Sequence, residues 1–333
     1  MDSGDVVDRW NVMKDFRYHV VSLVAVFLAL AVGVVLGSGP MRDALVGDMS
    51  DQIAALETEA EQARAAADAA TAQTATAQQF SDEAAPALLS EVLLGLTVAT
   101  VEAGQPASQE SNGVRDRLVQ AGATVAGEIV IEDAWTDPSQ SAFRSSLAST
   151  MAPNVVGVDD ASSPSMVLSH ALAQALMPGM LPPGATEADL ADTDFPDPAN
   201  ANERAALLLD LLVQAGLVSG TATAPIEAFA LIAGPGAADE AARAEVSSAL
   251  AATAVILAQY TPGVVVASGP DAPGDVASAV QNSPDASAVV ATVVEGTDSY
   301  GQISVPLAIS QAFSGSVGHY GPGEGRTLVP PFS

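Results

Sequence analysis

Apolar residues are concentrated in one continuous run near the start of the chain. Val20–Leu36 is seventeen residues long, with one hydroxyl (Ser22) and no charge. As a helix this run is about 26 Å long, close to the ~30 Å of a hydrocarbon core once the glycines behind it are added. Only a helix satisfies its own backbone in lipid. We therefore predict a transmembrane helix at residues 20–39.

Positive charge surrounds the start of this run. Arg9, Lys14 and Arg17 precede it, whereas the residues after Leu36 contain no lysine and eight arginines. The positive-inside rule then predicts that residues 1–19 are cytoplasmic and that the rest is extracytoplasmic, in a single-pass protein of the cell membrane. A cleaved signal peptide is the alternative, but the exit after Leu36 lacks a small-residue cleavage motif, which favours a retained anchor. Initiation at Met1 or at Met13 fits equally well.

A heptad pattern follows the anchor at residues 41–80, without proline or glycine after Asp48. Apolar and small residues recur there at alternating spacings of four and three, which is the seam of a coiled coil. We predict a stalk that forms a parallel homodimer, helped by Gly33-x-x-x-Gly37 in the anchor. A single helix packed on its own domain is the alternative. The predicted dimerisation residues are Met49, Ile53, Leu56, Ala60, Ala63, Ala67 and Ala70, and Thr74 and Ala77 continue the pattern.

Short apolar runs alternate with helical patterns over residues 84–333. Strands are predicted at 96–101, 124–131, 154–159, 228–233, 263–269 and 288–294. Helices are predicted at 110–120, 139–149, 165–176, 239–258, 275–281 and 302–313, and a further one is predicted to be capped by Asn202. This alternation predicts an α/β domain with a mostly parallel, Rossmann-like sheet. Five prolines at 178–200 indicate a linker, and the domain could divide near 178–201.

Composition narrows the choice of partners. Apolar residues make up 49 % of the chain, which is too many for a disordered tail. The net charge is −29, from 40 acidic against 11 basic residues, so the phosphates of a nucleic acid would be repelled. The absence of cysteine removes disulfides, thiol nucleophiles and thiolate metal sites.

Motifs for catalysis are missing from the sequence. No G-x-G-x-x-G, Walker A or G-x-S-x-G pattern occurs, and the single lysine precedes the anchor. His170 lies in an apolar helical segment and is interpreted as a packed side chain. His319 lies in a glycine-rich segment that we expect to be flexible. The sequence therefore predicts a protein that is not an enzyme and has no organic cofactor, with a nucleotide-binding sensor as a minor alternative.

Metal binding is the sharper question. Five carboxylates at Glu187, Asp189, Asp192, Asp194 and Asp197 lack the EF-hand order and are interpreted as a solvated linker. Thioether and imidazole ligands suit Cu(I) when cysteine is absent. A copper ion is therefore the one candidate cofactor, although methionine is also a common core filler. Its candidate ligands are Met166, His170, Met177 and Met180.

Two segments carry a family resemblance, FRYHVVSLVAVFLALAVGVVLGSGP at the anchor and VGHYGPGEG near the end, where Gly318, Tyr320, Gly321, Gly323 and Gly325 match the pattern. With the stalk and the α/β head, they resemble the actinobacterial copper transporter family typified by MctB, to which the cell-separation protein SteB is similar. The family name implies copper efflux or an outer-membrane pore. A SteB-like role implies an envelope scaffold with a SteA-like envelope or membrane partner and control of peptidoglycan hydrolases. An anchor, a stalk and a head of buried-type strands match the scaffold better than a pore.

Overall fold

The computed structural model describes the backbone of residues 7–37, 40–186, 189, 200–223, 225–237, 239–270, 274–298 and 301–331. Side chains are described from Arg17 onwards, apart from residue 36 and residues 40–51. The chain divides into two compact units, Met1–Ala75 and Thr76–Ser333. Each unit is described on its own below.

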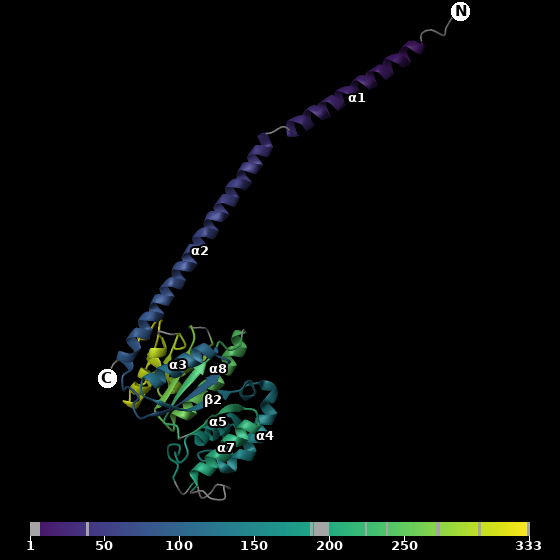
Figure 1. Ribbon diagram of the computed structural model, residues 1–333. Coiled ribbons are helices and arrows are strands. Elements are labelled where there is room, and N and C mark those ends of the chain that lie inside the picture. The colour runs from purple at the N-terminus through teal and green to yellow at the C-terminus, as the bar shows by residue number, and fades with distance from the viewer. Residues whose placement is uncertain are drawn as a thin grey trace, which may run out of the picture. The chain divides into compact units, whose positions relative to one another are not determined.

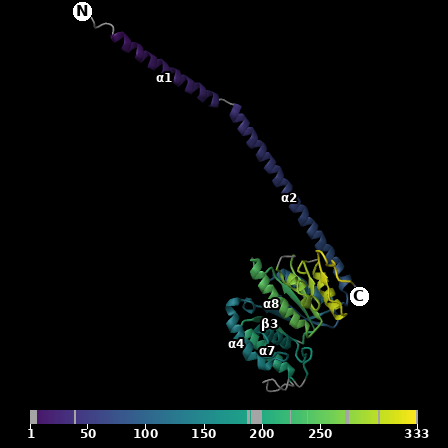
Figure 2. The same cartoon turned by 180° about the vertical axis from the view of Figure 1, so that it is seen from behind.

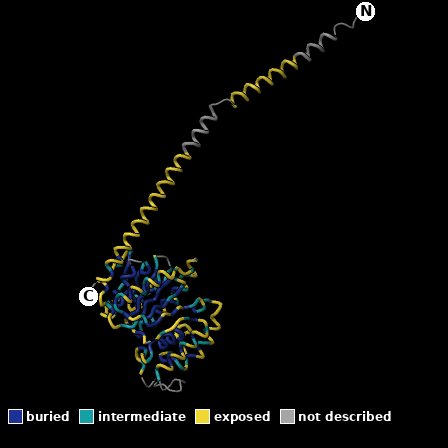
Figure 3. The backbone as a smooth tube through the Cα atoms, viewed as in Figure 1, coloured by how far each residue is buried: buried dark blue, intermediate teal, exposed yellow. Residues whose placement is uncertain are grey.

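Two helices make up the first unit, α1 (Val7–Gly37) and the greater part of α2 (Pro40–Leu89) (Figure 1). Both form where uninterrupted apolar or alanine-rich sequence predicts a helix. Arg17–Val35 in α1 has a mean hydropathy of 2.4 and none of it is buried. All described side chains of α2 up to Phe80 are exposed as well (Figure 3). The predicted helices at 20–39 and 41–80 are therefore present, and neither covers its apolar residues within its own unit.

A seven-stranded sheet organises the second unit, with the order β3-β2-β1-β4-β5-β6-β7. Neighbouring strands are parallel except for β3, which is antiparallel to β2 at one edge. The mostly parallel sheet that the sequence predicts is confirmed. The strands are β1 (Thr97–Ala103), β2 (Thr124–Ile131), β3 (Val218–Ala222), β4 (Ala228–Ala233), β5 (Gly263–Ser268), β6 (Ala291–Val293) and β7 (His319–Tyr320).

Helices cover both faces of the sheet (Figures 1 and 2). The two apolar clusters lie on opposite faces, because β1 contributes Ala99 and Val101 to one and Val98 to the other. The larger cluster includes residues of α4 (Ser141–Met151), α5 (Pro164–Leu176), α7 (Ala201–Gln214), α8 (Glu240–Ala258), α9 (Val276–Gln281) and α10 (Pro284–Ser287). The smaller cluster includes residues of the end of α2, α3 (Ser108–Gln120) and α11 (Ser304–Phe313).

The end of α2 belongs to the head. Ser81, Ala85 and Leu89 are buried at intervals of four, so this face of the last turns packs on the domain. Asp82 forms an ion pair with Arg117 of α3. The helix continues through Pro86, whereas the sequence places the end of the stalk at residue 80. Tertiary packing of the buried face extends the helix beyond its heptad pattern.

Several local predictions are wrong. Residues 154–159 form no strand, because a 3₁₀ turn at Ala152–Asn154 and a turn at Gly157 occupy this segment. The cap of α7 is Asn200, whose Oδ1 accepts the Glu203 N–H, instead of Asn202. The sequence pattern also misses β3, whose V-S-G-T-A stretch is largely exposed, and α10, which shortens the strand predicted at 288–294.

The glycine-rich tail is ordered around His319. β7 pairs with β6, and His319 Nδ1 lies 3.0 Å from the hydroxyl of Thr292, which accepts a 2.8 Å hydrogen bond from Gln281. The Thr292 hydroxyl thus links the side chains of Gln281 and His319. The prediction of a flexible segment is wrong, since a new edge strand and this chain of hydrogen bonds hold it on the sheet.

Candidate functional site

Helix α5 carries most of the side chains that the sequence selects. Its first turn is capped by Ser163, whose hydroxyl accepts the Met166 N–H at 3.3 Å, and Pro164 starts the helix. Every residue from Val167 to Leu176 is buried. Helices α4, α7 and α8 surround it, so the polar side chains on α5 must find partners inside the domain.

His170 is the centre of a buried polar network on α5. Its Nδ1 lies 2.8 Å from the hydroxyl of Tyr260, which also accepts a 2.9 Å hydrogen bond from Gln174. Gln174 bridges further to the backbone of Val156, through the carbonyl at 2.7 Å and the N–H at 3.2 Å. The direction of the hydrogen bond between Nδ1 and the Tyr260 hydroxyl depends on the imidazole tautomer, since either group can be its donor.

Burial keeps this network neutral. It lowers the pKa of His170 below its ordinary value and raises that of Tyr260. The interpretation of His170 as a packed side chain is therefore confirmed. The burial of the ring and its hydrogen bond to Tyr260 agree with a structural role for His170.

The four candidate copper ligands face different surroundings. Met166 is 40 % exposed and Met180 50 % exposed, whereas Met177 is fully buried in the core. His170 lines a separate polar cavity of about 580 Å³ with Pro182. Within the described ranges, no group of three or more histidine or carboxylate side chains is placed to hold a metal. The copper ligand set therefore stays a prediction, and its four residues have different surroundings in the head.

The acidic linker falls mostly outside the described residues, and this applies to Glu187, Asp192, Asp194 and Asp197. The carboxylate of Asp189 accepts hydrogen bonds from the N–H and the hydroxyl of Thr186. These bonds, from the backbone first, lower the pKa of Asp189. This carboxylate is engaged in a local turn.

Arg204 of α7 is a buried cation that the sequence-based predictions miss. It is 1 % exposed, and its Nε and Nη1 have no hydrogen-bond partner in the part of the chain that the structure describes. Burial lowers its pKa, while the neighbouring Tyr260 acts in the opposite direction. The signal in the sequence is its position, because Arg204 is four residues before Leu208 on the apolar face of α7.

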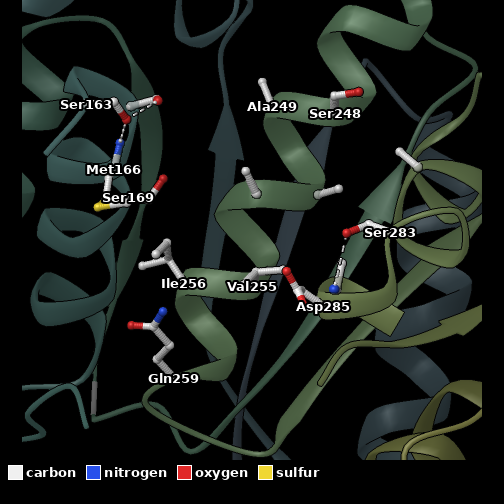
Figure 4. A pocket seen from close by; sticks show the side chains of 15 residues that line it. Ser163, Met166, Ser169, Ser248, Ala249, Val255, Ile256, Gln259, Ser283 and Asp285 are labelled. Carbon is white, nitrogen blue, oxygen red and sulfur yellow. Dashed lines mark hydrogen bonds between the residues drawn. The ribbon is translucent and has the colours of Figure 1, made fainter. Parts of the chain in front are cut away.

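A groove of about 500 Å³ crosses the outer side of α8. In Figure 4, Ser163, Met166 and Ser169 border it on the α5 side, Ser283 and Asp285 border it on the other side, and α8 runs between them. Hydroxyls and small side chains dominate this lining, and Asp285 is its only acidic residue. Among the described residues that line it, the groove does not bring together an acid, a base and a nucleophile, as a catalytic site would.

The strand order reverses between β1 and β4, where sheets of this kind bind ligands beyond the carboxyl ends of their strands. Here the two loops fill that space with backbone. The N–H of Gly234 donates to the Ala103 carbonyl at 2.8 Å. A Cβ added to Gly234 would lie 2.2 Å from the carbonyl oxygen of Gly104 and 2.6 Å from the nitrogen of Pro106. This close packing gives the Gly234 turn a structural role.

An apolar cavity of about 330 Å³, called here the base cavity, lies between the last turns of α2 and the end of the chain. Helix α2 lines it with Ala77, Phe80, Ser81, Ala84 and Leu88. The remaining lining residues are Val293, Val294, Gly301, Ile303, Ser304, Gly321, Pro322, Leu328 and Val329. No charged residue is among them, so this cavity suits apolar side chains.

Comparison with known proteins gives one family. A family model described as "Copper transport outer membrane protein, MctB" matches residues 13–331. The chain belongs to the MctB family. It is 27 % identical over 334 residues to the protein named copper transporter MctB of Mycobacterium tuberculosis, covering 95 % of this chain and 99 % of the relative. The Mycobacterium bovis protein gives the same values. The Mycobacterium leprae relative is 31 % identical over 142 residues, which are 42 % of this chain and 45 % of that protein.

Family membership confirms the resemblance drawn from the anchor and the tail. The name of the MctB family refers to a membrane, and α1 is apolar and long enough to cross one. The family name and the apolar helix α1 therefore both support membrane association. Neither observation gives the number of crossings or the orientation.

Proposed function

We propose that this member of the MctB family is a non-enzymatic scaffold of the cell envelope that dimerises through its stalk. The observation that carries the proposal is the exposure of the seam on α2. Ile53 is 53 % exposed and Leu56 is 63 % exposed. Bulky apolar residues repeated along one stripe of a helix need a partner surface, and the described part of their own unit provides none.

A membrane anchor completes the scaffold. In this proposal α1 crosses the cell membrane once, the short amino-terminal segment is cytoplasmic, and the domain of residues 84–333 is extracytoplasmic. Its partner is an envelope or membrane protein, SteA-like by resemblance, through which the scaffold controls peptidoglycan hydrolases during cell separation. The filled backbone space between Gly104 and Gly234 and the engaged histidines support a role without catalysis.

The stalk dimer is tested by disulfide trapping in membranes. The natural chain has no cysteine, so Ile53→Cys or Ala63→Cys gives a single reporter. Both positions face the partner in a parallel coiled coil and should form an interchain disulfide on mild oxidation. Ala65→Cys is the matched control, because it lies on the opposite side of the helix from Ala63. A chain that stays monomeric with seam cysteines, or equal trapping at residue 65, would remove the proposal.

Copper handling is a second candidate, as the name of the mycobacterial relatives suggests. The observation that favours it is the exposure of two thioethers, Met166 and Met180, on the head. Cu(I) titration of the full chain against a competing chelator tests it. Met166→Leu with Met180→Leu should weaken binding, whereas Met151→Leu in the core is the control. Equal affinity in all variants would end this candidate.

The two candidates differ in the cell. Deleting the gene and scoring both copper sensitivity and separation of daughter cells distinguishes them. The scaffold predicts chains of unseparated cells with unchanged copper tolerance. Copper handling predicts the reverse.

A further inference from the structure

The residues of α2 that line the base cavity have a regular spacing. Ala77, Phe80, Ser81 and Ala84 stand at i, i+3, i+4 and i+7 on the helix. Four residues with this spacing form the hole that accepts one knob from a facing helix in a coiled coil. The open side of the cavity therefore has the pattern of a knobs-into-holes interface that lacks its second helix.

The seam of the stalk leads directly into this hole. The spacing of four and three that begins at Met49 continues beyond Ala77 to Ser81, Ala84 and Leu88. These three residues belong to the same helix as the seam. Ser81 itself is 4 % exposed and packs on its own domain, so a second copy of α2 that follows the seam would meet the head at the base cavity, through Phe80, Ala84 and Leu88.

Large apolar side chains surround the cavity and remain exposed. Phe80 is 72 % exposed, Leu328 is 67 % exposed and Val329 is 42 % exposed. No charged side chain lines the cavity, although the chain carries a net charge of −29. Two copies of such an acidic protein repel each other over most of their surface. An uncharged patch is where they can approach.

The stalk also needs the area that this patch provides. From Ala60 to Ala77 the seam holds alanines and one threonine, which bury little apolar surface on pairing. A dimer held by this half alone would be weak. Burying Phe80, Leu88, Leu328 and Val329 at the end of the seam adds the large side chains that the alanine half lacks.

We propose that the base cavity is the head-to-head part of the dimer interface, occupied by α2 of a second copy whose Phe80 packs beside Leu328 and Val329. This inference rests on the proposed dimer and extends it from the stalk to the head. By two-fold symmetry each copy presents the same surface to the other, with Phe80 beside the seam of one copy and next to the tail of the other.

Mixed disulfides test the inference on the full chain in membranes. One tagged chain carries Phe80→Cys, and a differently tagged, co-produced chain carries Leu328→Cys. The expected result is a mixed dimer that retains both tags, at a yield several-fold above that of Phe80→Cys with Glu324→Cys, a control on the exposed tail. Ala63→Cys, measured in parallel, reports the stalk alone.

A cavity-filling variant provides the second measurement. Ala84→Trp should abolish the mixed disulfide and leave trapping at residue 63 unchanged, whereas Gln79→Trp, on the exposed side of the helix opposite Ala77, should change neither. Trapping at residue 63 without the mixed disulfide, or adducts of Phe80→Cys with a different protein, would overturn the inference and leave the dimer standing. Loss of both signals would overturn the dimer as well.

Discussion

The two units of this chain differ in how far their apolar side chains are buried. In the head, Phe229 and Leu231 of β4 are fully buried in the larger cluster on one face of the sheet, and Ile232 is fully buried in the smaller cluster on the other face. In the first unit, Leu28 of α1 is 62 % exposed and Leu56 of α2 is 63 % exposed. The head therefore contains its own core, whereas the described side chains of the first unit are exposed. The proposed assembly through the first unit can thus be tested separately from the folding of the head.

The largest effect is expected for truncation in the core of the head. Phe229→Ala removes an aromatic side chain that is 0 % exposed and leaves a cavity in the larger cluster. We expect the free energy of unfolding of the head to fall by about 3–5 kcal/mol. Denaturant unfolding of the full chain in detergent measures it. Seam trapping at residue 63 should persist under conditions where the head is still folded, and its loss there would contradict the separation of the two units.

Arg204 offers a change in the opposite direction. Its buried guanidinium has two nitrogens without partners among the described residues, so it carries a desolvation cost that hydrogen bonds do not offset. Arg204→Met fills similar volume without charge and should stabilise the head by about 1–4 kcal/mol. Thermal unfolding of the full chain checks this. Arg144→Met is a control, because the Arg144 guanidinium donates to two backbone carbonyls that the variant would leave without that donor.

A destabilised Arg204→Met chain would show that the guanidinium contributes favourably where it lies. The desolvation cost of its burial would then be smaller than its favourable interactions with the surrounding residues. The Tyr260 hydroxyl, which raises the pKa of Arg204, would then be the next group to substitute.

The strands that could be predicted are those that carry their signal locally. β2 and β4 begin and end at the predicted residues, because β4 is a continuous apolar run before Gly234 and β2 is a stretch rich in valine and isoleucine that follows the turn at Gly122. β3 is buried only at Val218, and β7 has two residues, so both depend on a neighbouring strand that lies far away in the sequence. Tertiary pairing supplies what the local pattern lacks.

The site could be predicted only in part for the same reason. The apolar sequence around His170 indicates that it is packed, and the structure confirms this. Its partner Tyr260 lies 90 residues away, and no local spacing indicates the pair. Gln174 does leave a signal, since it is four residues after His170 on an otherwise apolar helix.

Acid should weaken the head through its two histidines. Burial lowers the pKa of His170 and of His319, for which Arg326 adds to the effect. A histidine whose folded pKa is lowered stabilises the protein above its unfolded pKa of about 6.5, and this contribution is lost as the pH falls below that value. We expect the free energy of unfolding of the head to decrease between pH 6.5 and 5. Trapping of a seam cysteine pair formed beforehand should not respond.

Unfolding measured at a series of pH values gives the slope. A His170→Gln variant keeps an acceptor for the Tyr260 hydroxyl but cannot take up a proton, so it should lose part of this slope. A slope of equal size in that variant would contradict the assignment to His170. Asp298 gives no competing signal of the same sign, because burial raises its pKa, and its contribution to stability therefore increases as the pH falls.

A substitution in the seam should have the smallest effect on the stability of the head and a clear effect on dimerisation. Ala67→Leu adds a large apolar side chain at a predicted seam position that is exposed in the single chain. Because Ala67 belongs to the first unit and not to the core of the head, the free energy of unfolding of the head should change by less than about 0.5 kcal/mol. The dimer should become tighter, since leucine at such a position buries more surface against a second helix.

Ala65→Leu, on the opposite side of the helix, should leave both quantities unchanged. Sedimentation of the detergent-solubilised chain over a range of concentrations separates the two variants. If residue 67 lay against its own domain instead of a second copy, the leucine would alter the unfolding of the head and leave the mass of the particle unchanged.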